Sequence, residues 1–171
     1  MTTIQIQYNV LKAAAILSAK KDVRYYLQGV LIQATPNETR AVATDGNLLG
    51  AFQDTSVTND ANGLIELIVP RDTIDRLKAS GRNADTWVRL ECLDGARQWR
   101  MTYGTTSQLF EAVDGRFPDY GFVIPSEASG EPAQINPELI GRMHSAICTA
   151  AGDKKAHMEM RTNGTGPTLV H

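Results

Sequence analysis

The sequence predicts an α+β protein in which mostly antiparallel sheets are backed by helices on one face. Two observations support this fold class. An order of one strand, one helix and further strands recurs along the chain, with helix starts near residues 9, 71 and 137. The segments between the helices alternate apolar and polar side chains, as strands with one buried face do. We therefore expect strand–helix–strands half-modules as the building unit.

The first half-module begins at the N-terminus. Residues 3–8 alternate apolar and polar side chains, which indicates a half-buried strand. Asn9 is expected to cap a helix over 9–18. Strand-like runs follow at 25–34 and 40–52, and an Asp-Gly turn interrupts the second run.

The second half-module repeats this order. A strand over 64–69 leads through a proline into a helix expected over 71–80. A strand over 87–93, followed by the Asp94-Gly95 pair, predicts a hairpin. Its second strand begins directly after the turn and continues in broken form to about residue 113.

The third half-module is expected over 133–171 and opens with a strong helix start. Asn136 is followed by a proline, which predicts a helix over 137–151 that a glycine closes. Two further strands are expected at 155–161 and 166–171. The preceding run, rich in glycine, proline and acidic residues, predicts a linker.

Composition and charge restrict the function classes. The chain has 17 basic and 19 acidic residues, for a net charge of −2, so affinity for nucleic acid would need a local basic surface. No apolar run approaches the roughly 20 residues that a bilayer span needs, and the N-terminus lacks the features of a signal peptide. Cys92 and Cys148 form no disulfide framework and suit a reducing compartment, so we expect a cytoplasmic protein.

Signatures of catalysis are scarce. The sequence contains no phosphate-binding loop, no metalloprotease motif, no nucleophile elbow and no paired C-x-x-C motif. His157 and Glu159 share a face of an expected strand and could share a metal, but a solvated polar face explains them more simply. We therefore expect no enzyme, no cofactor and no metal site.

Basic residues are more informative by position than by number. Arg71, Lys78 and Arg82 follow one another at steps of seven and four on the second expected helix. Lys12 lies on the first helix and Arg142 on the third. A solvated helix face explains this stripe as well as a nucleic-acid track does.

Four further motifs occur along the chain: DVRYYLQGVLI (22–32), AVATDGNLL (41–49), LIVPRDTIDRL (67–77) and LFEAVDGRFPDY (109–120). In this order and spacing they resemble a known family, the bacterial DNA polymerase III beta sliding clamp, and specifically its middle domain. The resemblance covers about residues 20–125.

The resemblance implies a DNA-clamp-like fold and a non-enzymatic processivity factor. Clamps of this family are rings of six like domains, each of two half-modules, with sheets outside and helices lining the hole. They encircle duplex DNA without reading its sequence, tether the polymerase and are opened by a clamp loader. The DNA-binding residues that the resemblance implies are Lys12, Arg24, Tyr26, Arg71, Lys78, Arg82 and Arg142. Of these, Arg24 and Tyr26 match family positions that line either the peptide pocket or the DNA-facing surface beside it.

The resemblance also implies a pocket for a short apolar peptide of a polymerase. The family's pocket positions correspond to Leu27, Thr44, Gly46, Asn47, Leu49 and Pro125. Two departures are expected to weaken capture. Asn47-Leu48 stands where the family commonly has His-Arg, and the family's apolar C-terminal tail is not found before His171.

Pairing of half-modules in the family predicts the domain organisation. Residues 1–121 would form one domain, 122–132 a linker and 133–171 an unpaired, incomplete third half-module. Its apolar helix face would then be exposed, which favours self-association over a monomer. The residues of that face are Leu139, Met143, Ala146 and Ala150. The alternative function is a clamp-derived interaction module or decoy that binds clamp partners without encircling DNA.

Overall fold

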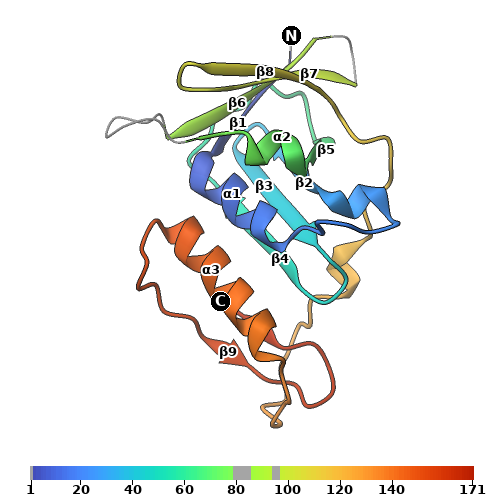
Figure 1. The fold of residues 1–171 in the computed structure, drawn as a ribbon, viewed down its shortest axis with the longest axis vertical. Helices are drawn as coiled ribbons and strands as arrows, with labels where there is room; N and C mark the ends of the chain where they lie inside the picture. The colour runs from blue at the N-terminus through green and yellow to red at the C-terminus, as the bar shows by residue number, and fades with distance from the viewer. Residues whose placement is uncertain (1, 79–85, 94–96) are drawn as a thin grey trace.

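The computed structural model describes residues 2–78, 86–93 and 97–171 (Figure 1). Two four-stranded antiparallel sheets form the larger part, the two-sheet body, which we define as residues 3–111. A C-terminal unit, residues 133–171, lies beside it. Among the described residues, no helix is both long enough and apolar enough to cross a membrane.

The first sheet has the order β4-β3-β2-β5, and all its strand pairs are antiparallel. Its strands are β2 (Gly29–Thr35), β3 (Glu38–Thr44), β4 (Leu49–Asp54) and β5 (Ile65–Pro70). Both faces of β2 are buried, because Val30 and Ile32 face the main core while Leu31 packs into a smaller cluster with Phe117. The chain after the second sheet therefore covers the far face of the first.

The second sheet has the order β1-β6-β7-β8 and is also antiparallel. Its strands are β1 (Thr3–Gln7), β6 (Trp87–Cys92), β7 (Gln98–Tyr103) and β8 (Thr106–Glu111). The two half-modules exchange their first strands: β1 pairs with β6, and β5 pairs with β2. The α+β prediction is confirmed, and the exchange makes one folding unit of two half-modules.

Helix α1 (Tyr8–Leu17) lies in the core that both sheets share (Figure 1). It begins at Tyr8, one residue before the predicted start, and the Asn9 side chain makes no capping bond there. The backbone N–H of Tyr8 instead donates to the carbonyl of Thr86 at 2.9 Å. A contact across the fold thus replaces the local cap that the sequence indicated.

Helix α2 (Arg71–Asp75) is shorter than the predicted 71–80. After it the N–H of Leu77 donates to the carbonyl of Ile74 at 3.1 Å, a tighter turn than an α-helix makes. This turn buries Leu77, and the gain from burying an apolar side chain favours it over another helical turn. Residues 79 and 80 of the predicted helix lie outside the described residues, as does the Asp94-Gly95 turn.

Other boundaries differ from the prediction in the irregular parts of the chain. The strand expected from residue 25 begins at Gly29, because Tyr25–Gln28 form a 3₁₀ turn, η1. The strands expected at 155–161 and 166–171 shrink to the two-residue strands β9 (Met160–Arg161) and β10 (Leu169–Val170). A second 3₁₀ turn, η2 (Tyr120–Phe122), precedes the irregular run that leads to the C-terminal unit.

Helix α3 (Pro137–Ala151) matches its predicted bounds. The Asn136 side chain accepts a hydrogen bond from the N–H of Glu138 at 2.9 Å, and Gly152 closes the helix with a φ of 66°. The predicted exposure of its apolar face is wrong: Ala146 is fully buried, and the other three residues of that face pack against the core that contains α1. The C-terminal unit buries this face within its own chain.

Candidate functional site

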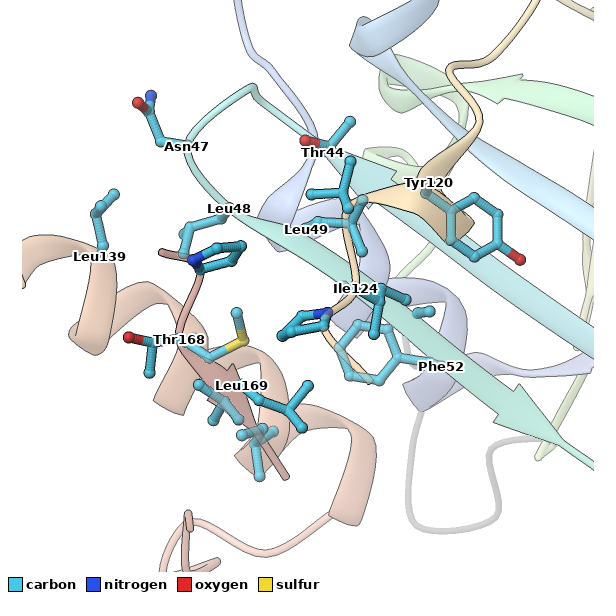
Figure 2. A pocket seen from close by; sticks show the side chains of 18 of the residues that line it. Thr44, Asn47, Leu48, Leu49, Phe52, Tyr120, Ile124, Leu139, Thr168 and Leu169 are labelled. Atoms are coloured by element: carbon cyan, nitrogen blue, oxygen red, sulfur yellow. The ribbon is translucent and has the colours of Figure 1, made fainter. Parts of the chain in front are cut away.

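A cavity of about 960 Å³ lies between the two-sheet body and the C-terminal unit. Figure 2 shows Leu49, Phe52 and Ile124 on one side of the space, facing Leu139 and Leu169 from the C-terminal unit. All the residues predicted for a peptide pocket line this cavity: Leu27, Thr44, Gly46, Asn47, Leu49 and Pro125. Segments far apart in the sequence therefore meet at this cavity.

The turn between β3 and β4 forms the first wall. The carboxylate of Asp45 accepts the N–H groups of Asn47 and Leu48, both at 2.9 Å, and the Thr44 hydroxyl accepts that of Gly46 at 3.1 Å. Gly46 has a φ of 93°, a conformation that glycine adopts at little cost, and the Arg24 guanidinium packs against it. These bonds fix the direction in which Leu48 and Leu49 enter the cavity.

The segment after β8 forms the second wall. Tyr120 anchors it, because its hydroxyl donates to the side-chain oxygen of Gln33 at 2.6 Å. Val123, Ile124 and Pro125 follow and line the cavity. Of these, the prediction included only Pro125. A run of two branched apolar residues directly before it was the signal that sequence reasoning missed.

The third wall comes from the C-terminal unit, which the motif resemblance did not reach. Helix α3 contributes four large apolar side chains besides Ala150 and Ala151, and the chain around β9 and β10 contributes others. They are Leu139, Ile140, Met143, Ile147, Met158, Met160, Leu169 and Val170. Methionine side chains adapt to irregular apolar shapes, so this wall can accommodate ligands of differing outline.

The chemistry of the cavity favours binding over catalysis. The lining is mostly aliphatic and aromatic, and none of its described residues is an aspartate or a glutamate. Arg24 is the only arginine or lysine among those residues, and it is ion-paired with Asp22 at 2.8 Å. Such a site holds apolar side chains of a ligand by removing them from water.

Arg142 of α3 connects two of these walls. Its guanidinium forms an ion pair with the carboxylate of Asp45 and donates to the carbonyl of Ile16 at 3.1 Å. Partial burial raises the pKa of Asp45. The hydrogen bonds from Arg142 and from the N–H groups of Leu48 and Asn47 outweigh that effect and lower the pKa below its usual 3.8.

Two of the cations predicted to contact DNA are used inside the fold. Lys12 donates to the carbonyl of Ile74 at 2.8 Å, and burial lowers its pKa. Arg71 donates to the backbone carbonyl of Ser18 at 2.9 Å and pairs with Asp75. These side chains join α1 to α2, so a ligand would have to displace existing bonds to engage them.

The remaining predicted DNA contacts do not form one stripe. Lys78 is exposed but follows the end of α2, so it does not share a helix with Arg71. Tyr26 is half-buried and packs against the cluster around Leu27. Arg82 lies outside the described residues. Four exposed cations follow α1 and α2, namely Lys20, Lys21, Arg76 and Lys78. Other exposed cations of the described residues lie elsewhere, among them Arg89, Arg116, Lys154 and Lys155.

Within residues 2–78, 86–93 and 97–171, no group of three or more histidine, cysteine, aspartate or glutamate side chains is arranged to hold a metal ion. The carboxylate of Glu159 is paired with Arg161 at 2.9 Å. His144 and Cys148 contact each other on the outer side of α3, with 3.5 Å between Nε2 and Sγ.

Comparisons with known proteins agree with this architecture. Residues 5–119 match the family described as DNA polymerase III beta subunit, central domain. The chain is 34% identical to the Beta sliding clamp of Pseudomonas putida over 116 residues, which cover 68% of this chain and 31% of that protein. It is 29% identical to the Beta sliding clamp of Caulobacter vibrioides over 155 residues, covering 88% of this chain and 40% of the relative.

Solved structures support the same fold. The crystal structure of the DNA polymerase sliding clamp from Pseudomonas aeruginosa with ligand superposes with a TM-score of 0.63 at 22% identity. The superposition covers 99% of this chain and 49% of that one. The clamp from Bacillus subtilis gives a TM-score of 0.60 at 18% identity over 74% of this chain. The chain thus spans about half the length of the Pseudomonas aeruginosa clamp that it resembles in fold.

Proposed function

This chain belongs to the DNA polymerase III beta sliding-clamp family, which is non-enzymatic, and we propose that it captures short apolar peptides of DNA polymerase or other replication partners. The cavity between the two-sheet body and the C-terminal unit would be the peptide site. Capture of such a peptide is common to a processivity clamp and to an interaction module or decoy, so it is the function that the geometry supports best.

The observation that supports this proposal most strongly is the convergence of all six predicted pocket residues on one apolar cavity. A bound peptide with two apolar anchors would gain about 2 kcal/mol from burying each of them. The costs of association and of ordering the peptide offset much of this gain. We therefore expect weak binding, with a dissociation constant on the order of 1 mM.

Fluorescence anisotropy with a labelled peptide of the Gln-Leu-Xaa-Leu-Phe kind tests the site. Leu49→Lys places a charge inside the cavity and should abolish saturable binding. The matched control is Leu109→Lys on β8, an exposed leucine outside the cavity, which should bind as the wild type does. Absence of binding by the wild type at millimolar peptide would contradict the proposal.

A second candidate function is tracking of duplex DNA as a processivity factor that a clamp loader opens. The exposed cations that follow α1 and α2 support it, because they flank the contact between the two helices. The net charge of −2 and the internal bonds of Lys12 and Arg71 favour the interaction module instead.

Retention on DNA distinguishes these two candidates. A closed ring stays on nicked circular DNA and slides off linear DNA, whereas an interaction module treats both alike. The assay is run with a clamp loader of the family, and salt is varied, because each phosphate contact adds roughly one unit to the salt slope. Equal retention on both DNA forms would support the interaction module.

We also propose the domain division 1–121, 122–132 and 133–171, and self-association through sheet edges. Strands β4 and β8 each pair with one neighbour in the described sheets, and Leu109 on β8 is 67% exposed. Light scattering at tens of micromolar protein measures the mass in solution and so tests self-association. A mass of one chain throughout would contradict self-association.

The proposed partners are replication proteins, so we also propose that the protein works in the bacterial cytoplasm.

A further inference from the structure

Arg142 is the residue through which α3 makes charged contact with the two-sheet body. Its guanidinium lies between the carboxylate of Asp45 and the carbonyl of Ile16, near the C-terminal end of α1. The two acceptors belong to different elements, so one side chain joins three parts of the fold. Resemblance to the family had suggested Arg142 as a DNA contact, but these bonds direct its charge into the protein.

Two of the three parts that Arg142 joins, α3 and the turn with Asp45, are walls of the cavity. On its own helix, Leu139 and Met143 line the space, and on the Asp45 turn Leu48 and Leu49 line it. The separation of these walls sets the width of the cavity. A contact that holds α3 to this turn therefore controls the shape of the site without touching the ligand, and Arg142 and Asp45 are themselves absent from the lining.

We propose that Arg142 is a positioning residue of the peptide site: its ion pair with Asp45 holds α3 at the distance from the β3–β4 turn at which a peptide is bound. This inference rests on the proposed peptide capture. Exposed ion pairs contribute little, but here the Asp45 side chain is only 14% exposed and accepts two backbone N–H groups. Loss of Arg142 leaves a half-buried carboxylate without its main cationic partner.

Other charges near Asp45 do not substitute for Arg142. Arg24 packs against Gly46 in the same turn, but both of its side-chain hydrogen bonds go to Asp22. From α1, the group that faces Arg142 is the neutral carbonyl of Ile16. Neither group can connect α3 to the turn when the Arg142 side chain is removed.

Three variants separate positioning from general stability. Arg142→Met keeps the aliphatic stem and removes the charge. Arg142→Lys keeps the charge but loses the planar group that reaches two acceptors at once. Asp45→Asn removes the charge, while its amide oxygen can still accept the N–H groups of Asn47 and Leu48. Arg161→Met is the matched control, because Arg161 forms an exposed ion pair with Glu159 within the C-terminal unit.

Peptide affinity and amide exchange are measured on the full chain for each variant. We expect Arg142→Met to raise the dissociation constant for the labelled peptide about tenfold and to speed amide exchange in α3. Amide exchange in β2 and β3 should stay as in the wild type. Arg142→Lys should recover part of both effects. The double variant Arg142→Met/Asp45→Asn should bind no worse than Arg142→Met alone, because both changes remove the same contact. Arg161→Met should change neither quantity.

The two readouts fail independently. If the wild type binds no peptide, the proposed function fails. Amide exchange in α3 then still shows whether the ion pair holds this helix. Unchanged exchange in Arg142→Met would overturn the positioning role, and so would faster exchange with unchanged peptide affinity.

Discussion

The two-sheet body and the C-terminal unit are held together by different means. In the body, β1 and β5 each pair with a strand from the other half-module, so the chain crosses between the sheets. The C-terminal unit has one capped helix and one pair of two-residue strands. The apolar face of its helix packs against the core of the two-sheet body. The body is thus fixed by non-local pairing, whereas the C-terminal unit is fixed by local signals and one interface.

The two ways of holding the chain imply different stabilities for the two regions. A unit held by one interface opens at a lower free energy than a core made of interleaved strands. The cavity lies along that interface, so the C-terminal unit supplies one of its walls. Elements that bind ligands are commonly drawn from the less stable parts of a fold.

The largest expected loss of stability comes from a substitution on β1, a strand that the two half-modules exchange. Ile6 on β1 is fully buried and pairs with Val88 of β6. We expect Ile6→Ala to lower the free energy of unfolding by about 3 kcal/mol, since it removes methyl groups and leaves a space in a core shared by both sheets. Urea denaturation measures this. Exposed Leu109→Ala is the control and should change stability by less than about 0.5 kcal/mol.

Replacement of glycine by alanine is expected to change stability in opposite directions in the two regions, at Gly29 of the body and at Gly141 of α3. At Gly29 in β2 an added Cβ would lie 2.6 Å from Ile68 Cγ2 and 2.8 Å from the Val69 carbonyl oxygen. Gly29→Ala should therefore destabilise the body by about 2 kcal/mol through overpacking.

Gly141 in α3 meets nothing within 4 Å of the same added atom. Gly141→Ala should stabilise the helix by about 0.5–1 kcal/mol, because alanine loses less backbone entropy there. Denaturant melts report the first variant, and amide exchange in α3 reports the second. If both variants were stabilised, or both destabilised, the expected contrast between a crowded glycine in the body and an uncrowded one in α3 would be wrong.

The same division explains which features the sequence could predict. Helix α3 was found to the residue because Asn136, Pro137 and Gly152 act locally. The end of α2 was missed because burial of Leu77 depends on the rest of the core. Six residues of the cavity were predicted from the family resemblance that the motifs carry, but the wall that α3 contributes was not predicted. The contact between Asp45 and Arg142 joins positions far apart in the chain, and no local pattern contains it.

A smaller change in stability is expected for a cation that joins two elements than for a core residue, and none for a cation that faces solvent. Arg71→Met should cost about 1 kcal/mol of stability, because its bonds to Ser18 are lost. It should leave the salt slope of any DNA binding unchanged. Lys78→Met should leave stability unchanged and lower that slope by roughly one unit if the protein binds duplex DNA. Thermal melts and DNA titrations at several salt concentrations measure both.

The smallest effect is a pH dependence confined to the surface of the body. Hydrogen bonds from the Arg24 side chain and backbone lower the pKa of Asp22 from 3.8 to about 2. A carboxyl group with a lower pKa in the folded state contributes stability that is present above pH 3.8 and is lost as the pH falls toward 2. Because the Arg24 side chain of this pair is solvent-exposed, we expect only a shallow slope, which Asp22→Asn should flatten between those values. An NMR titration of the Asp22 carboxyl carbon checks the pKa directly. A midpoint near 3.8 would show that Arg24 does not hold Asp22 in solution.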